Sequence, residues 1–253
     1  MPNTDIALKA LSLLDLTDLT DTCTPQAIDA LCDKAVGPNG TVAAVCIWPR
    51  FVAQAKARLD GSGVRVATVV NFPAGGEKTL EVEAETRQAL DDGADEIDMV
   101  MAYRAVIARR PGFAETQIVR IKETVGERAA LKVILETGEL KDAALIQSCS
   151  TIAVDAGADF IKTSTGKVAV NATPDAAEIM IKAIKDSGKP CGFKAAGGVK
   201  TVDDAARYLQ IAADIMGPDW ASATTFRFGA SGLLNALNAA IEGGDVTTSA
   251  EGY

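Results

Sequence analysis

The sequence predicts a (β/α)8 barrel of the TIM type, formed as a single domain over residues 1–253 with a short N-terminal helix. Eight short apolar runs recur at intervals of roughly 20 to 35 residues, and a helical pattern follows each of them. This alternation is typical of α/β proteins with a parallel sheet, and about 250 residues is a usual length for an eight-stranded barrel. An open doubly wound sheet would show the same alternation, because periodicity does not reveal whether a sheet closes.

The expected strands are bounded by glycine, proline or polar residues, which end extended segments. They cover residues 13–17, 41–48, 64–72, 96–101, 130–136, 160–164, 191–196 and 224–228. Helical spacing of apolar residues predicts helices over residues 6–14, 26–36, 50–59, 77–92, 139–156, 173–186, 201–215 and 231–241, with one more before residue 130. Thr173 and Pro174 are typical of a helix start, and Gly93 and Gly157 can end a helix in a left-handed conformation.

Composition excludes several classes of function. The net charge is −9, so nucleic acids and anionic membranes are poor partners. The chain has no histidine, which excludes Ser-His-Asp triads, Cys-His pairs and His-ligated metals. Five cysteines without CxxC spacing predict neither a disulfide framework nor a zinc site. We therefore expect a soluble, cytoplasmic protein that needs no metal or other cofactor, in which Lys, Asp, Glu, Tyr or Cys must carry any acid–base chemistry.

Lys162 lies within an apolar run that we expect to be the sixth strand. Because a strand alternates its faces, Phe160, Lys162 and Ser164 should share one side and Lys162 should point into the interior. Burial without a partner disfavours an ammonium ion, which is the usual way to make an amine nucleophilic enough to form a Schiff base with a carbonyl. The alternative is a lysine whose charged end reaches solvent at the strand end.

Other strands also carry one charged residue among apolar ones: Asp98, Lys132, Lys194 and Arg227. An isolated ion inside a barrel is costly, so these side chains should compensate one another in a cluster. A network that only fills the lumen is one interpretation. The other is a lysine nucleophile kept in its amine form by neighbouring lysines, with a carboxylate that moves protons.

Glycine-rich turns follow the last three expected strands. Gly166 and Lys167 follow the sixth, Gly197 and Gly198 the seventh, and residues 229–232 the eighth. Barrels commonly bind phosphate with the loops after strands seven and eight, using backbone N–H groups at helix starts. Each turn alone could be an ordinary strand–helix connection, but three neighbouring turns predict a phosphate site. Neither a GxGxxG nor a Walker sequence occurs, which disfavours dinucleotides and nucleoside triphosphates.

Longer motifs resemble one known family. ADFIKTSTGKVAVNATP at residues 158–174 and GFKAAGGV at 192–199 are similar to motifs of class I deoxyribose-phosphate aldolases. The resemblance extends through LLDLT (13–17), AAVCIWPR (43–50), ADEIDMV (94–100), LKVILETGEL (131–140) and FRFGASGLL (226–234). It implies a (β/α)8 barrel that reversibly cleaves 2-deoxy-D-ribose 5-phosphate to D-glyceraldehyde 3-phosphate and acetaldehyde without a metal, in deoxyribonucleotide and deoxynucleoside catabolism.

The resemblance also implies roles for individual residues. The Schiff-base lysine of the family corresponds to Lys162, its second lysine to Lys194 and its proton-relay aspartate to Asp98. A C-terminal tyrosine that assists proton transfer in some members corresponds to Tyr253. The phosphate contacts of the family correspond to Gly166, Lys167, Gly197, Gly198, Gly229 and Ser231.

Two positions depart from the family pattern. Ala195 stands where the family often has proline, and Gly232 stands in place of a second serine, so one phosphate hydroxyl is missing. Cys46 on the second strand is expected to serve packing. The implied partners are a phosphosugar and an aldehyde, and a homodimer is compatible with the sequence. Two alternatives stay open: a Schiff-base barrel aldolase with another donor, such as a ketone, and a non-catalytic phosphosugar-binding barrel.

Overall fold

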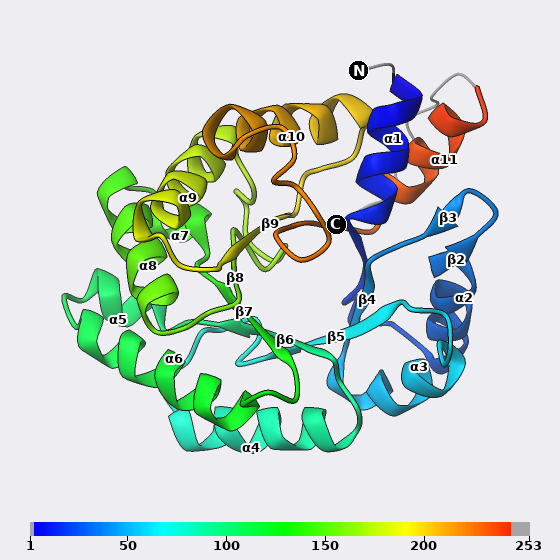
Figure 1. The fold of residues 1–253 in the computed structure, drawn as a ribbon. Coiled ribbons are helices and arrows are strands. Elements are labelled where there is room, and N and C mark those ends of the chain that lie inside the picture. Colours follow the sequence, from blue (N-terminus) through cyan, green and yellow to red (C-terminus); the bar gives the residue numbers. More distant parts are fainter. Residues whose placement is uncertain (1–2, 244–253) are drawn as a thin grey trace.

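A closed barrel of parallel strands surrounded by helices forms the core of the computed structural model, which describes residues 3–243 (Figure 1). The strands follow one another around the barrel in the order β1, β10, β9, β8, β7, β6, β5, β4, and β4 pairs with β1 to close it. The predicted (β/α)8 barrel is therefore confirmed, and the open sheet is excluded.

The eight barrel strands lie close to the predicted apolar runs. Their bounds are β1 (Leu14–Asp18), β4 (Ala44–Ile47), β5 (Arg65–Val70), β6 (Glu96–Val100), β7 (Ala130–Ile134), β8 (Phe160–Lys162), β9 (Gly192–Ala196) and β10 (Phe226–Ala230). The second predicted strand was too long at its start. Residues 40 and 41 belong instead to a separate antiparallel hairpin of β2 (Val36–Gly37) and β3 (Gly40–Thr41), where Gly40 has a φ of 128°.

Helices surround the barrel, and α1 precedes the first strand as predicted. Their bounds are α1 (Asn3–Ser12), α2 (Pro25–Ala35), the 3-10 helix η1 (Pro49–Phe51), α3 (Val52–Arg58), α4 (Thr79–Asp91), α5 (Tyr103–Ile107), α6 (Pro111–Val125), α7 (Thr137–Leu140), α8 (Ala143–Asp155), α9 (Pro174–Ser187), α10 (Val202–Met216) and α11 (Leu233–Ile241). Helix α1 packs against α10 and α11, so the two ends of the barrel sequence meet on one side (Figure 1). None of the described helices is long and apolar enough to span a membrane.

Local chemistry explains several of the helix ends. The hydroxyl of Thr173 accepts a hydrogen bond from Ala176 N at the start of α9, with Pro174 in the first turn, as predicted. Gly93 and Gly157, with φ of 99° and 91°, adopt the predicted left-handed conformation before β6 and β8.

One long helix expected over residues 139–156 is instead two. Lys141 has a φ of 59°, which ends the short helix α7 after one turn. Asp142 then starts α8, because its carboxylate accepts hydrogen bonds from Ala144 N and Leu145 N. The segment between β6 and β7 likewise holds two helices, α5 and α6, where the sequence predicted one.

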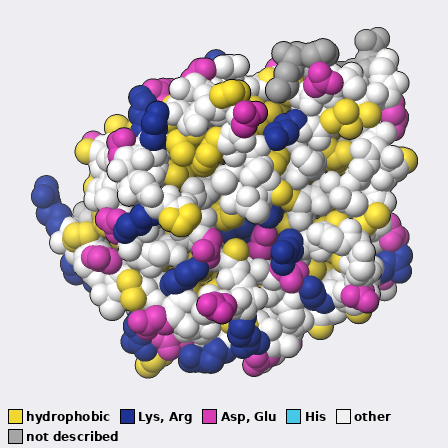
Figure 2. All heavy atoms as spheres, viewed as in Figure 1, with side chains coloured by type: hydrophobic (Ala, Val, Ile, Leu, Met, Phe, Trp, Pro, Cys, Tyr) yellow, Lys and Arg dark blue, Asp and Glu magenta, His cyan; other side chains and the backbone are white. Residues whose placement is uncertain are grey.

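The apolar core fills the layer between strands and helices, whereas charged residues occupy part of the barrel lumen. On the face seen in Figure 2, acidic and basic side chains are interspersed, and charged side chains are visible in a hollow near its centre. That face carries no continuous basic area of the kind that binds nucleic acid.

Candidate active site

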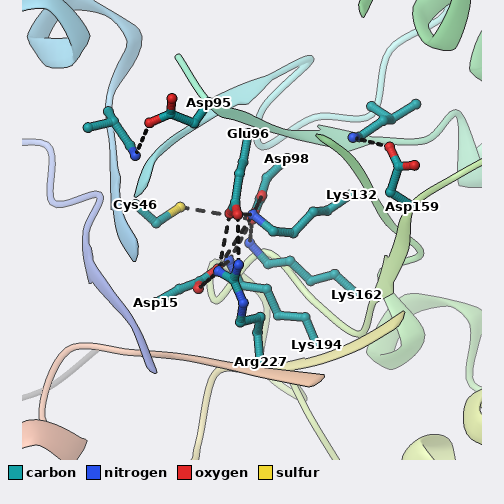
Figure 3. Close-up of polar contacts among 12 residues, drawn as sticks. Asp15, Cys46, Asp95, Glu96, Asp98, Lys132, Asp159, Lys162, Lys194 and Arg227 are labelled. Atoms are coloured by element: carbon teal, nitrogen blue, oxygen red, sulfur yellow. Dashed lines mark hydrogen bonds and ion pairs between the residues drawn. The ribbon is translucent and has the colours of Figure 1, made fainter. Parts of the chain in front are cut away.

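Charged side chains from six strands converge inside the barrel (Figure 3). The predicted cluster of Asp98, Lys132, Lys162, Lys194 and Arg227 is present, and each of these residues is at most 5% exposed. Strand register produces this arrangement, because Lys162 pairs with Lys194 and Lys194 with Arg227 on adjacent strands. Inward-facing side chains at these positions therefore lie at similar depth.

Asp98 lies at the centre of the cluster. Its Oδ2 accepts hydrogen bonds from Lys162 Nζ and Lys194 Nζ, both at 2.8 Å, and its Oδ1 accepts one from Lys132 Nζ at 2.8 Å. Burial by itself would raise the pKa of Asp98, but the three lysines hold it well below its usual range. Asp98 is therefore a carboxylate, placed against the amine of Lys162.

Two further carboxylates, Asp15 and Glu96, complete the cluster and were not predicted from the sequence. Asp15 binds Lys194 Nζ and Arg227 Nη1, both at 2.5 Å, and Glu96 binds Lys132 Nζ at 2.5 Å and Arg227 Nη2 at 2.7 Å. The signal that predicted the other members of the cluster, a charged residue within an apolar strand, could also have identified these two. Asp15 is a single charge between leucines of the first strand, and Glu96 precedes Asp98 by two residues and so faces the same side of its strand.

Pairing within the cluster is unequal. Among the described residues, Lys132 lies within 4 Å of three carboxylates, and Lys194 and Arg227 each contact two. Lys162 contacts one, Asp98, at an oxygen that it shares with Lys194.

The three better-paired basic residues, Lys132, Lys194 and Arg227, are held in their charged forms. Burial favours the neutral form of Lys194, yet Asp15 and Asp98 raise its pKa above the ordinary lysine value, and nearby carboxylates do the same for Lys132 and Arg227. These three cations balance the three carboxylates of the cluster. With these three side chains charged, the cluster of Asp15, Glu96, Asp98, Lys132, Lys162, Lys194 and Arg227 has no net charge when Lys162 is an uncharged amine, the form that attacks a carbonyl.

An apolar wall faces the charged cluster across the lumen. Leu19, Cys46 and Val69 are buried there, and Trp48 and Phe72 pack against them in an edge-to-face pair with ring centroids 5.6 Å apart. Cys46 Sγ lies 3.9 Å from Asp98 Oδ2, and burial raises the pKa of the Cys46 thiol. A neutral buried thiol agrees with the packing role expected for Cys46.

Three of the predicted phosphate-binding residues lie in glycine turns at the carboxyl ends of β8 and β9. Gly166 and Gly198 have φ of 85° and 87°, and a Cβ added at either would meet no atom within 4 Å. Gly197, with a φ of 79°, packs against the side chain of Asn171. Open space beside a backbone in the left-handed region leaves room for an anion to approach the N–H groups.

Gly229 and Ser231 mark the end of β10 and the start of α11. A Cβ at Gly229 would lie 2.9 Å from Lys194 Cε and 3.0 Å from Ala196 Cβ, so glycine is required there for the lysine side chain to pass. Ser231 is exposed just before α11, and Gly232, the N-cap residue of that helix, provides no side-chain hydrogen bond. The first N–H groups of α11 are therefore available to an anion, whereas Thr201 and Asp204 form a capping box at the start of α10.

Lys167 extends across the mouth of the barrel. Its Nζ donates a hydrogen bond to the carbonyl oxygen of Leu19 at 2.8 Å and lies 3.8 Å from Asp21 Oδ1, in the loop after β1. Strands β9 and β10, which carry the other glycine turns, lie between β8 and β1 in the barrel order. The ammonium is thus on the side of the mouth where the glycine turns gather.

Glu136 was not predicted as a site residue, and Ser164 does not lie on the strand where the sequence predicted it. Strand β8 ends at Lys162, so Ser164 lies beyond it, and its buried hydroxyl has no hydrogen-bond partner among the described residues. Glu136 was taken as the last residue of a strand, but it lies beyond β7 in the left-handed region, bonded to Thr165. Burial raises the pKa of Glu136. No sequence signal marks a non-glycine residue with positive φ.

Two further expectations concern Tyr253 and the binding of a metal ion. Tyr253 lies outside the described residues. Within residues 3–243, no set of three or more Cys, Asp or Glu side chains is arranged to hold a metal ion. Asp15, Glu96 and Asp98 instead bind the lysines and the arginine of the cluster.

A second opening lies at the opposite, amino ends of the strands. Its lining includes Arg65, Asp95 and Lys122, together with Glu96 and Arg227 of the charged cluster. The ion network therefore extends through the lumen from this opening to Lys162.

Comparison with known proteins agrees with this geometry. The family model for DeoC/LacD family aldolases matches residues 9–239. The deoxyribose-phosphate aldolase of Agrobacterium fabrum (strain C58) is 53% identical over 250 residues, which cover 98% of this chain and 96% of that protein.

Solved structures show the same fold. A putative deoxyribose-phosphate aldolase from Toxoplasma gondii ME49 has a TM-score of 0.87 at 26% identity, over 96% of each chain. One from Coccidioides immitis has a TM-score of 0.82 at 30% identity and covers 92% of this chain and 85% of its own. With a barrel that holds a buried lysine cluster and a family model that matches nearly its whole length, the chain belongs to the DeoC/LacD family of aldolases.

Proposed function

We propose that this protein is a Schiff-base aldolase that reversibly cleaves 2-deoxy-D-ribose 5-phosphate to D-glyceraldehyde 3-phosphate and acetaldehyde. The observation that carries the proposal is the pairing in the lumen: three carboxylates face four basic side chains, and Lys162, which contacts only Asp98 among the described residues, is the least paired of the four. The Agrobacterium fabrum relative, named for this activity, supports the choice of substrate. Such an enzyme would serve deoxyribonucleotide and deoxynucleoside catabolism.

Lys162 Nζ attacks the aldehyde carbon C1 of the open-chain sugar, and loss of water gives an iminium ion. The bond between C2 and C3 then breaks. Its electron pair moves toward the iminium to form an enamine, while the C3 hydroxyl loses its proton and becomes the carbonyl of glyceraldehyde 3-phosphate. Protonation of the enamine at C2 and hydrolysis of the imine release acetaldehyde and restore Lys162.

Asp98 and Lys194 carry opposite charges and affect Lys162 in different ways. Asp98 Oδ2 lies 2.8 Å from Lys162 Nζ, the atom that gains and loses protons as the imine forms, and relays these protons through water. Lys194 stays charged between Asp15 and Asp98, and its positive charge disfavours a second ammonium at Lys162.

The phosphate is held at the mouth of the barrel by backbone N–H groups and one cation. Gly166, Gly197, Gly198 and the start of α11 provide the backbone, with Ser231 as a hydroxyl donor, and Lys167 provides the charge. Gly229 stands nearby but serves mainly to admit Lys194. Because Gly232 supplies no hydroxyl, we expect weaker selection for the phosphate than in a relative with two serines.

The direct test is cleavage of deoxyribose 5-phosphate, followed by the appearance of acetaldehyde and glyceraldehyde 3-phosphate. We expect turnover with acetaldehyde as the donor in the reverse direction and with a chelator present. Addition of a ketone donor to glyceraldehyde 3-phosphate in preference to acetaldehyde would instead favour a different barrel aldolase. Binding of the phosphosugar without any product would favour a non-catalytic binding protein.

We also infer that the enzyme works in the cytoplasm. All five cysteines are buried as free thiols, and burial raises the pKa of Cys149 and of Cys191 to about 12. A reducing compartment keeps such thiols unoxidised.

A further inference from the structure

Glu136, just beyond the carboxyl end of β7, is a strained residue next to the catalytic strand. It has φ and ψ of 60° and 58°, a conformation that non-glycine residues adopt only where the surrounding structure enforces it. The backbone on either side is fixed to the catalytic segment, because Leu135 N donates to Lys162 O at 2.9 Å and Thr137 N to Thr163 O at 3.0 Å. These hydrogen bonds fix the backbone of Glu136 and so determine the direction of its side chain.

The carboxylate of Glu136 binds one residue, Thr165, through two hydrogen bonds. Thr165 N donates to Oε1 at 3.1 Å and Thr165 Oγ1 donates to Oε2 at 2.6 Å, in a site where Glu136 is 1% exposed. Thr165 Oγ1 in turn accepts a hydrogen bond from Lys167 N at 3.0 Å. Glu136 thus determines the shape of the Thr165–Lys167 turn, in which Gly166 has its positive φ.

The remainder of the loop after β8 is held by other contacts. Gly138 packs so closely on Val170 that a Cβ there would lie 1.9 Å from the Val170 carbonyl oxygen, and Ala172 N donates to Gly197 O at 3.3 Å. Thr173 then starts α9 with its own cap. Loss of the Glu136 carboxylate should consequently loosen the turn without releasing the whole loop.

We propose that Glu136 is a positioning residue, which by holding Thr165 keeps Gly166 and Lys167 in the conformation that receives the phosphate of the substrate. The proposal rests on the proposed function for the identity of the phosphosugar. It assigns Glu136 no contact with the reacting atoms. The effect of its removal should therefore be greatest on the phosphorylated substrate.

Four variants test this role. Glu136→Gln and Thr165→Val interrupt the same chain of hydrogen bonds, and Thr165→Val does so with a side chain of nearly the same shape. Thr165→Ser keeps the hydroxyl and should restore wild-type behaviour. Glu139→Gln is the matched control, because Glu139 is an exposed acid on the same short helix and its replacement removes the same charge.

Steady-state kinetics on deoxyribose 5-phosphate and on plain deoxyribose provide the readout. We expect Glu136→Gln and Thr165→Val to raise KM for the phosphosugar by roughly 5- to 50-fold with little change in kcat, as loss of one or two hydrogen bonds in substrate binding predicts. The loss on plain deoxyribose should be several-fold smaller. The double variant should be no worse than either single variant, since both break one chain of contacts.

An equal loss on both sugars, or an unchanged KM for the phosphosugar, would overturn the proposal. If Glu136→Gln does not fold, Thr165→Val gives the same comparison, with thermal unfolding as the check. Inorganic phosphate binding, measured by calorimetry, separates this proposal from the proposed function. If the wild type cleaved neither sugar, the proposed function would fall, whereas phosphate binding that weakened in Thr165→Val but not in Glu139→Gln would still support the role of Glu136.

Discussion

Lys162 differs from the other buried basic residues in how few carboxylates surround it. Lys132, Lys194 and Arg227 each have at least two acidic neighbours within 4 Å, and Lys162 has Asp98. Removing one partner from a buried ion pair is expensive, so the better-paired side chains keep their charges. The proposal of Lys162 as the nucleophile therefore rests on the number of its partners in the lumen as well as on the strand on which the lysine lies.

Replacing Lys194 with methionine tests this balance. The variant removes one positive charge but leaves Asp15 paired with Arg227, and Asp98 with Lys132 and Lys162. A protonated Lys162 would then balance the remaining carboxylates, so its amine form should require more alkaline conditions. We expect the acid limb of the profile of kcat/KM against pH, which reports ionisation of the free enzyme, to move to higher pH. An unchanged profile at full activity would show that Lys194 only fills the lumen.

Most of the charged residues in the candidate site could be predicted from the sequence. Asp98, Lys132, Lys162, Lys194 and Arg227 stand out because each is a lone charge in an apolar run. Which oxygen meets which nitrogen could not be predicted, because it depends on strand register around a closed barrel. The left-handed conformation of Glu136 was also unpredictable, since Thr165 stabilises it from another element.

At the scale of elements, two regions that were both expected to bind phosphate, the loop after β8 and the end of β10, have different surroundings. The loop after β8 carries Lys167 over the mouth, whereas Gly229 near the end of β10 lies against Lys194 inside the lumen. Glycines that look alike in the sequence therefore have different functions. The sequence predicted three phosphate turns but could not show that one of them makes room for a lysine.

Lys167→Ala should weaken the use of the phosphorylated sugar selectively. Of the groups of the substrate, the cation is expected to contact only the phosphate. A charge-assisted hydrogen bond contributes about 1.5 to 3 kcal/mol, so kcat/KM for deoxyribose 5-phosphate should fall roughly 10- to 150-fold. The value for plain deoxyribose should change little. An equal fall in kcat/KM for the two sugars would contradict a role of Lys167 in binding the phosphate.

Gly229→Ala, in contrast to Lys167→Ala, should reduce the turnover of both sugars. An added methyl group at 2.9 Å from Lys194 Cε must displace that side chain, which then loses its hydrogen bond to Asp98, the carboxylate that also binds Lys162. We expect kcat to fall by a similar factor, at least about tenfold, on both sugars. A selective rise in KM for the phosphosugar would instead indicate that Gly229 belongs to the phosphate-binding site.

At the scale of the whole molecule, closure of the barrel brings together residues as distant in sequence as Asp15 and Arg227. The alternation of strands and helices predicted the elements, but only closure explains why first and last strands share an ion pair. Closure of the barrel therefore completes the cluster that forms the candidate active site.

Acid should weaken the fold through this cluster. Lys194, Arg227 and Lys132 outweigh the effect of burial and lower the pKa of Asp15, so its contribution to stability is complete above the unfolded value, near 4, and is lost as pH falls below it. Asp15→Asn should lower the free energy of unfolding at neutral pH by about 3 kcal/mol, because Lys194 and Arg227 lose a buried partner. Denaturant unfolding at pH 7 and pH 3 should show a smaller difference from wild type at pH 3. A difference that is the same at both values would contradict the account.

The most direct test of the account is to trap the imine. Acetaldehyde and borohydride should add one ethyl group to the protein, and peptide mass mapping should locate it on Lys162. In the control variant Lys162→Arg, which keeps the positive charge but cannot form an imine, no ethyl group should be added and the folded protein should retain less than about 1% of wild-type cleavage. Modification of Lys194 or Lys132 in place of Lys162, or appreciable turnover by Lys162→Arg, would contradict the assignment of Lys162 as the nucleophile.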